Sequence, residues 1–461
     1  MKKVSFIFIL GLTLMLAPAL KNADKTNSEL PAFAGDSSFS VAWGTHNEAF
    51  GNDDKFIYLY TELRGGVANN TPQRKPLNIA LVVDRSGSMG GNKIVYAQQA
   101  AKMLVQNLHL GDHFALVDYD DKISTPVYST TIAGNKASIL KEIDKLFPRG
   151  ATNLCAGMLE GFNQAKTHYK AEDLNRVILL SDGQANTGIS DNMEIQKQAQ
   201  LKLQTTGISL STFGIGADYN ESLMTNLAEY GNGNYYFINN PDEITTQLAA
   251  EMQGLMRTVA QNIKIRIALP SENLEVEKVY GASYSMENGT LVINAGNVIA
   301  EETKPVMIKL RIKNMGAQAF HFTGKILYTD ANTSAEKEFQ KEFSLHYEQD
   351  KIAIENTKNK IVWNAVQSYE LNDIMETAMR EMELGNEQKA KVLLDTIHTV
   401  KYLGFVQDTT HFITNTTVIK TYHIQSANNT NFKSQSAYNQ KIMLKQGKSD
   451  NYKMRAKVIK K

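Results

Sequence analysis

The feature that most constrains this chain is an apolar stretch that ends in a cluster of oxygen-bearing side chains. Residues 77–83 are mostly apolar and rich in β-branched side chains, and they run directly into Asp-Arg-Ser-Gly-Ser at 84–88. We interpret the stretch as a buried parallel strand whose carboxyl end presents Asp84, Ser86 and Ser88 in one turn. One carboxylate and two hydroxyls are hard ligands that suit a divalent cation, Mg²⁺ first. Because Asp and Ser also occur in ordinary turns, the motif needs support from elsewhere in the chain.

Two later segments give that support. Thr152 lies in a loop before a predicted helix, and Asp182 follows a second apolar run at 177–180. Each also has a plainer interpretation, since Thr152 can cap the helix and Asp182 can be an ordinary residue at a strand end. In a parallel sheet, however, all carboxyl ends of strands meet at one edge, where ligands bind. If the two strands are neighbours, Asp84 and Asp182 share one cleft that the Thr152 loop covers. Such a site leaves the metal an open position, which a carboxylate from a partner would naturally fill.

The middle of the chain alternates between strand and helix patterns, which predicts an α/β fold with a doubly wound, mostly parallel sheet. The predicted strands are 78–84, 113–119, 176–181, 208–214 and 234–238, with an antiparallel edge strand at 123–128. The predicted helices include 93–108, 153–168 and 195–205.

The rest of the chain changes pattern twice. Alternating apolar and polar residues, as at 263–269 and 306–312, predict a β-sandwich, and a helical period follows until Gly385 breaks it. We expect two early strands to pair with the sandwich, which would make the α/β domain an insertion into it. The predicted divisions are a signal peptide (1–19), a flexible leader (20–37), β-strands that pair with the sandwich (38–75), the α/β domain (76–258), a β-sandwich-like domain (259–350), a helical hairpin (351–405) and a C-terminal extension with a basic tail (406–461).

The N-terminus predicts export. Two lysines precede an apolar core at 4–16 and an Ala-Pro-Ala site at 17–19, which is the pattern of a secretory signal peptide; an uncleaved anchor is the alternative. We expect no transmembrane span after cleavage and a periplasmic, cell-surface or secreted location. The net charge of +1 argues against a nucleic-acid partner. Cys155 is the only cysteine, so no disulfide can form within the chain, and we expect a buried, inert thiol there.

Other charged residues gather in two kinds of segment. Asp118, Asp120 and Asp121 follow one predicted strand, and Asp218 and Glu221 follow another. We expect solvated acidic loops there, with a second metal site as the alternative. From Lys441 onward the chain carries eight basic residues against Asp450, which predicts a solvated tail or a weak contact with an anionic surface.

Taken together, the site motifs resemble those of the von Willebrand factor type A (vWA) family. Its metal-ion-dependent adhesion site consists of Asp-x-Ser-x-Ser, a Thr and an Asp, which match Asp84, Ser86, Ser88, Thr152 and Asp182. The resemblance covers about residues 76–258, and with its flanking segments the chain is similar to secreted bacterial proteins of this family. It implies a bound Mg²⁺, with Mn²⁺ or Ca²⁺ as other candidates, held by the hydroxyls directly or through water and by the second Asp commonly through water.

The leading functional hypothesis is a non-enzymatic, metal-dependent adhesion module that coordinates an acidic side chain of a partner protein. One alternative is a structural envelope protein with a purely stabilising metal, and another is a metal-dependent phosphohydrolase. Against the latter, residues 84–86 do not form the Asp-x-Asp of aspartyl-phosphate enzymes, and residues 87–93 lack the spacing of a phosphate-binding loop. The oligomeric state stays open at this point.

Overall fold

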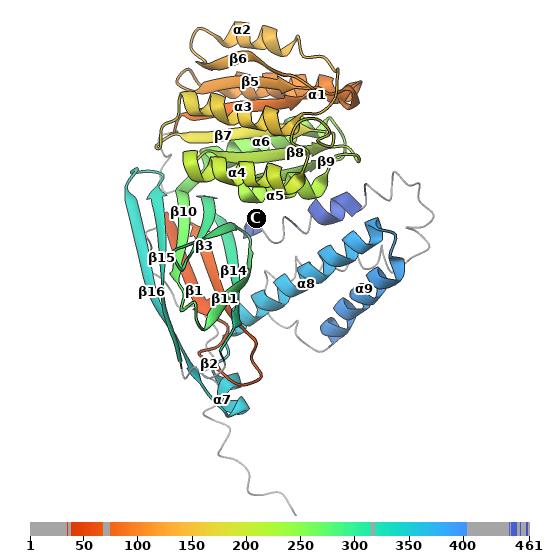
Figure 1. Cartoon of the computed structure of the whole chain (residues 1–461). Coiled ribbons are helices and arrows are strands. Elements are labelled where there is room, and N and C mark those ends of the chain that lie inside the picture. The colour runs from red at the N-terminus through yellow and green to blue at the C-terminus, as the bar shows by residue number, and fades with distance from the viewer. Residues whose placement is uncertain are drawn as a thin grey trace, which may run out of the picture.

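The computed structural model describes residues 35, 38–67, 74–314, 319–402, 442, 444–449, 452 and 458–459. The predicted signal peptide, nearly all of the predicted leader and most of the C-terminal extension lie outside these residues. The described part forms three β-sheets with helices around them (Figure 1). None of its helices is both long enough and apolar enough to cross a bilayer.

Residues between 77 and 256 form an α/β unit around one sheet, called sheet C. Its strands are β4 (Leu77–Asp84), β5 (His113–Tyr119), β6 (Ile123–Thr131), β7 (Leu174–Ser181), β8 (Ser209–Ile215) and β9 (Asn232–Ile238). The spatial order is β6-β5-β4-β7-β8-β9, and all neighbours are parallel except the edge strand β6. The doubly wound sheet and its antiparallel edge strand are therefore confirmed.

Helices cover both faces of sheet C. They are α1 (Asn92–Asn107), α2 (Lys136–Ile143), α3 (Leu154–Thr167), α4 (Asn192–Thr206), α5 (Glu221–Tyr230) and α6 (Glu243–Met256), and a short 3₁₀ turn, η1 (Gly87–Met89), follows β4. Helices α1, α2 and α6 pack on one face and α3, α4 and α5 on the other. Every residue of β4 is buried, because the strand lies between two others and beneath helices on both sides. This explains its continuous apolar sequence.

Helix α3 approaches β4 unusually closely. A Cβ atom at Gly161 would lie 2.4 Å from Val82 Cγ2, so only glycine fits at this point of the helix. The helix begins at its cap Asn153, whose side chain accepts a hydrogen bond from Ala156 N. This tight packing fixes the loop before α3 near the carboxyl end of β4. Cys155 in the same helix is buried, and burial raises the pKa of its thiol to about 11.

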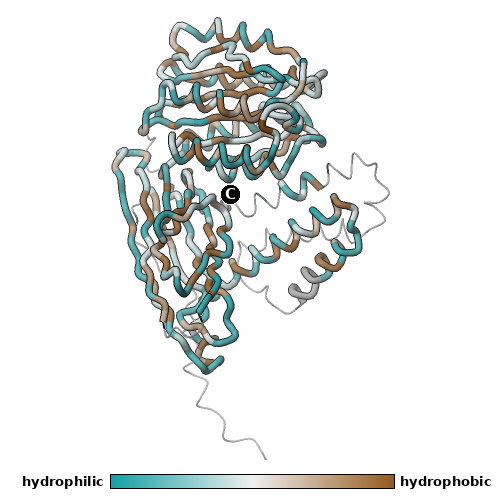
Figure 2. Tube along the Cα trace, in the orientation of Figure 1, coloured by the Kyte–Doolittle hydropathy of each residue, from teal (hydrophilic) through white to brown (hydrophobic). Residues whose placement is uncertain are grey.

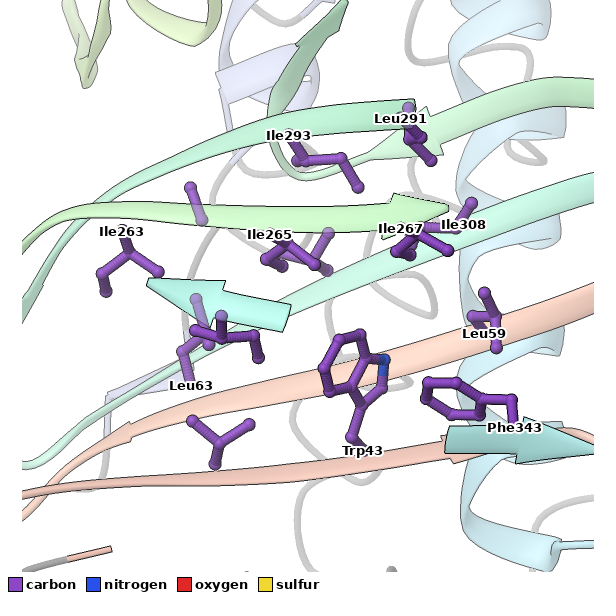
Figure 3. Close-up of a cluster of buried hydrophobic side chains, with 14 of the residues drawn as sticks. Trp43, Leu59, Leu63, Ile263, Ile265, Ile267, Leu291, Ile293, Ile308 and Phe343 are labelled. Atoms are coloured by element: carbon purple, nitrogen blue, oxygen red, sulfur yellow. The ribbon is translucent and has the colours of Figure 1, made fainter. Parts of the chain in front are cut away.

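The other two sheets pack face to face as a β-sandwich. Sheet A contains β1 (Phe39–Thr45), β3 (Phe56–Gly65), β11 (Leu274–Tyr280), β14 (Glu302–Ile312) and β17 (Val458–Ile459). Sheet B contains β2 (Ala49–Phe50), β10 (Thr258–Ala268), β12 (Ser283–Glu287), β13 (Thr290–Ile299), β15 (Ala319–Asp330) and β16 (Glu336–Tyr347). Alternate residues of the strands point into the space between the sheets, as the labelled side chains in Figure 3 show for Ile263, Ile265 and Ile267. The Trp43 and Phe343 rings meet there edge to face, with centroids 5.1 Å apart.

The chain leaves the sandwich after β3 and returns to it at β10, and the α/β unit is built between these two strands. Strand β3 pairs with β14, which comes much later in the sequence. Sheet A is thus made of strands from both sides of the α/β unit. Figure 2 shows hydrophobic residues concentrated along the strands of both units and hydrophilic residues along many of the connections.

Three helices follow the sandwich, namely α7 (Lys351–Asn356), α8 (Lys360–Glu383) and α9 (Glu387–Tyr402). Helix α8 packs on the outer face of sheet A through residues that include Val362 and Tyr369, which join a cluster with Tyr58 and Tyr60 of β3. Gly385 has a φ of 77°, a conformation that favours glycine, and the chain turns there into α9. The predicted helical hairpin is confirmed.

The described part of the C-terminal segment packs against the α/β unit. Lys445 Nζ donates a hydrogen bond of 2.9 Å to the carbonyl of Tyr219 and lies 4.0 Å from the centre of its ring. Lys448 Nζ lies 3.7 Å from the buried carboxylate of Glu221. The predictions of a solvated basic tail and of a solvated Glu221 are therefore wrong here, because the two opposite charges pair and bury each other.

The contact between α8 and the sandwich should make stability depend on pH through His46. This residue is buried, accepts a hydrogen bond from Tyr58 N at Nδ1, and has the Trp363 ring 5.8 Å away. Burial lowers the pKa of His46 from 6.5 to about 4, with a smaller contribution from the positive charge of nearby Lys358. Between pH 6.5 and about pH 4, the His46 imidazole is therefore protonated in the unfolded chain and neutral in the folded protein, so unfolding takes up a proton.

As the pH falls from 7 to 5, we expect His46 to lower the unfolding free energy by about 2 kcal/mol. Urea denaturation at a series of pH values would measure it. The His46→Gln variant should lack this part of the decline, whereas His321→Gln, at an exposed position on β15, should follow the wild type. Identical profiles for wild type and His46→Gln would contradict the prediction.

Candidate metal centre

The carboxyl end of β4 holds three of the predicted site residues in one turn. Ser86 N donates a hydrogen bond of 2.8 Å to Asp84 Oδ1, which turns the chain sharply after the strand. The next turn, η1, brings Ser88 Oγ to 3.0 Å from Ser86 Oγ. The carboxylate and both hydroxyls therefore lie together, and Ser88 is exposed to solvent while Asp84 and Ser86 are buried.

The carboxyl end of β7 lies directly beside this turn. Val83 of β4 pairs with Leu180 of β7, so the next residues, Asp84 and Ser181, stand side by side. Ser181 Oγ donates a hydrogen bond of 2.6 Å to Asp84 Oδ2. Asp182 follows, and its Oδ1 accepts a hydrogen bond of 2.8 Å from Ser88 Oγ. The two strands thus bring both carboxylates to one point of the sheet edge, where strand order reverses.

Thr152 completes the group from the loop before α3. Its backbone is held on both sides, because Thr152 N donates to Asn186 Oδ1 at 2.8 Å and its carbonyl accepts from Asn186 N at 3.1 Å. A Cβ atom built at Gly183 would lie 3.3 Å from Thr152 Oγ1 and 3.6 Å from Ser88 Oγ. The two hydroxyls therefore lie next to the same residue, Gly183, where a side chain would crowd Thr152. The structure brings all five predicted site residues together.

The negative charge of the two buried carboxylates in this group favours a bound cation. Asp84 is fully buried and Asp182 is 1% exposed. Burial raises the pKa of Asp84 to about 6, and the charge of Asp182 contributes to the rise, although hydrogen bonds from Ser181 and Ser86 oppose it. Placing two buried carboxylates together is unfavourable unless positive charge compensates them.

The donor set fits a hard divalent cation. Its carboxylate and hydroxyl oxygens match the ligand preference of Mg²⁺, Mn²⁺ and Ca²⁺. Within the described residues, no group of three or more His, Cys, Asp or Glu side chains is placed to hold a metal ion. A metal at this edge would therefore depend on the Ser and Thr hydroxyls as well as on the two carboxylates.

A buried network of charges supports the loops around the site. Arg85 Nε lies 2.9 Å from Asp118 Oδ1 and 3.3 Å from Asp120 Oδ2, and all three residues are buried. Arg149 Nε donates to Asp120 Oδ2 at 2.7 Å, and Arg149 N donates to the carbonyl of Arg85. Asn153 N donates to the carbonyl of Asp120. The network thus joins the turn after β4, the loop after β5 and the loop that carries Thr152.

This network corrects the prediction that Asp118 and Asp120 belong to a solvated acidic loop. They are 3% and 1% exposed, and arginines neutralise them; only Asp121 is exposed. Burial raises the pKa of Asp118, even though Arg85 opposes the rise. This arrangement could not be predicted from the sequence, because Arg85 lies inside the Asp-x-Ser-x-Ser motif, where its side chain could equally have pointed to solvent.

Sequence reasoning also missed two residues that touch the predicted ligands. Ser181 is the hydroxyl donor to Asp84, and Lys93 Nζ lies 2.5 Å from Asp182 Oδ2. Ser181 could have been found, since it precedes Asp182 at a strand end. Lys93 could not, because its role depends on how α1 begins relative to β7.

The charge network generates a prediction about stability. Arg85→Met removes the cation between two buried carboxylates, and we expect a loss of about 3 kcal/mol of unfolding free energy. Arg149→Met is the matched control: its side chain is 47% exposed, and we expect a loss below about 1 kcal/mol. Urea denaturation of both variants measures the difference, and equal losses would contradict the network's assigned role.

Comparison with known proteins places the α/β unit in a family. The model of the von Willebrand factor type A domain matches residues 78–251. YfbK of Escherichia coli, described as an uncharacterized protein, is 36% identical over 194 residues, which cover 41% of this chain and 33% of that protein. Human inter-alpha-trypsin inhibitor heavy chain H2 is 27% identical over 197 residues, which cover 41% of this chain and 21% of that protein. The match to each of these relatives thus covers about a third of its length or less.

Solved structures share the fold over more of the chain. A von Willebrand factor type A protein from Catenulispora acidiphila superposes with a TM-score of 0.64 at 14% identity, covering 79% of this chain and 87% of that one. The ArnB paralog VWA2 from Sulfolobus acidocaldarius gives 0.59 at 19% identity, covering 91% and 98%. The family model thus identifies residues 78–251 as a von Willebrand factor type A domain, and the geometry of sheet C and these solved structures agree with that fold.

Proposed function

We propose that this chain is a metal-dependent protein-binding module in which Mg²⁺ at the carboxyl ends of β4 and β7 coordinates an acidic side chain of a partner protein. Domains of the vWA family are commonly metal-dependent protein-interaction modules. The ligands to the metal in this proposal are Asp84, Ser86, Ser88, Thr152 and Asp182. The observation that carries the proposal is the convergence of two buried carboxylates and three hydroxyls at one sheet edge.

Access to solvent separates an adhesion site from a purely structural one. Ser88 and its neighbours Gly87 and Gly90 are exposed, while the carboxylates lie beneath them. A metal held from below by carboxylates and hydroxyls would keep a face toward solvent, where a partner's carboxylate can complete its coordination. Mn²⁺ or Ca²⁺ could take the same place, but few carboxylates and several hydroxyls favour the smaller ions.

We further propose that the chain functions outside the cytoplasm, in the periplasm, at the cell surface or after secretion. This rests on the signal-peptide pattern of residues 1–19. We also propose the sequence-based domain division as the functional one, with residues 76–258 as the metal-binding domain and the sandwich and hairpin as its support. We expect no enzymatic role for the site.

Metal binding itself can be tested without a partner. Titration of the protein with MgCl₂ by calorimetry should show one site, and Asp84→Asn or Ser88→Ala should weaken it at least tenfold because each removes a ligand. At 100 times the dissociation constant, Mg²⁺ should stabilise the wild type by about 2.7 kcal/mol. Asp121→Asn is the matched control, since it removes an exposed carboxylate on a neighbouring loop. An unchanged affinity in Asp84→Asn would contradict the proposed ligand set.

Partner binding requires a second experiment. Immobilised mature protein is incubated with envelope extract in Mg²⁺ and in chelator, with Asp84→Ala and Asp121→Ala alongside. We expect a partner that is retained by wild type and Asp121→Ala only in Mg²⁺, and lost with Asp84→Ala. The same proteins in every lane would mean that recognition lies elsewhere on the chain and that the metal is structural.

A further inference from the structure

The described structure places one lysine against the predicted metal ligands. Lys93 Nζ lies 2.5 Å from Asp182 Oδ2 and donates a longer hydrogen bond, of 3.3 Å, to the carbonyl of Ser88. A Cβ atom at Gly216, in the turn after β8, would lie 3.7 Å from the same Nζ. The ammonium group therefore lies at the ends of three neighbouring strands, on the carboxylate assigned to the metal.

The position of Lys93 in its helix makes this contact informative. It is the second residue of α1, where the partial positive charge of the helix disfavours a cation. The first turn of α1 contains no acidic residue, and its cap Gly91 offers no side chain. The buried carboxylate of Asp182 is therefore the charge that compensates Lys93. The side chain is 27% exposed, whereas that of Asp182 is fully buried, so the lysine can leave toward solvent and the aspartate cannot.

We propose that Lys93 is a built-in cation that neutralises Asp182 when no metal is bound and is displaced when Mg²⁺ enters the site. This inference rests on the proposed function, since it concerns regulation of the same metal site. The ammonium group and the metal require the same carboxylate, and two cations at hydrogen-bonding distance from it would repel each other. Metal binding is then an exchange of one cation for another, and the apo site stays folded without an uncompensated buried charge.

An exchange of this kind lowers the affinity for the metal. Each binding event must break the Lys93–Asp182 pair, so the observed dissociation constant includes that cost. Removing the lysine should tighten Mg²⁺ binding, although the substitution adds no ligand. A lysine that only positions the site would have the opposite effect.

The test compares wild type with Lys93→Gln, which removes the charge and shortens the side chain by one atom. Calorimetric titration with MgCl₂ should give a dissociation constant roughly three- to tenfold lower for Lys93→Gln, while Lys93→Arg should stay close to wild type. Lys102→Gln is the matched control, because Lys102 lies on the same helix and pairs with Asp144 at the surface. It should bind Mg²⁺ as the wild type does.

Thermal unfolding provides a second readout that does not depend on a partner. In chelator, Lys93→Gln should melt below wild type because Asp182 has lost its compensating cation, and saturating Mg²⁺ should remove the difference. The rise in melting temperature caused by Mg²⁺ should therefore be larger in Lys93→Gln than in wild type or Lys102→Gln.

The outcomes separate this inference from the proposed function. Equal or weaker Mg²⁺ affinity in Lys93→Gln overturns the exchange while leaving the metal site intact. Mg²⁺ binding by Lys93→Gln but not by wild type contradicts both the proposed function and the exchange, because the lysine would then block the site instead of giving way to the metal. Failure of both proteins to bind Mg²⁺ overturns the metal site and the exchange together.

Discussion

The parallel pairing of β4 with β7 is the constraint on which the candidate site depends. It places Asp84 beside Ser181 and lets Asp182 reach Ser88, so ligands far apart in sequence meet at one sheet edge. The backbone hydrogen bonds between β4 and β7 fix this arrangement more rigidly than side-chain contacts could. The stability of the whole sheet therefore offsets the repulsion between the two buried carboxylates. The site can then hold an excess of negative charge, which a cation can neutralise.

Around this centre the molecule compensates charge with charge wherever it buries it. Arg85 pairs with two buried aspartates beneath the loops of the candidate site, and Lys445 and Lys448 neutralise Glu221 at the start of α5. The difference lies in how easily each cation can leave. The guanidinium of Arg85 is nearly inaccessible, whereas Lys93 is partly exposed. An ion pair with a buried carboxylate thus stabilises the scaffold at Arg85, whereas the ion pair of Lys93 is one that a metal ion could replace.

The sequence predicted the parts of the structure that follow from local periodicity and from the rule that the carboxyl ends of parallel strands meet at one edge of a sheet. The apolar run before Asp84, the break at Gly385 and the alternation in β10 each depend on neighbouring residues, and the structure contains the corresponding elements. The partners of Asp120, Glu221 and Lys93 could not be predicted in this way. Each contact joins segments that meet only through tertiary packing, and a charged side chain in a loop has the same local pattern whether it is solvated or paired.

The insertion of the α/β unit between β3 and β10 has a consequence for how the chain folds. Sheet A needs β3 to pair with β14, across a long stretch of sequence, whereas most neighbouring strands of sheet C also follow one another in the sequence. Contacts between distant segments form slowly, because the loop between them must first be closed. A folded α/β unit would shorten that loop greatly by holding its two ends in fixed positions. We therefore expect pulse-labelled hydrogen exchange to protect β4 and β7 before β3 and β14, so that the α/β unit acts as the template on which the sandwich assembles; simultaneous protection would contradict this order.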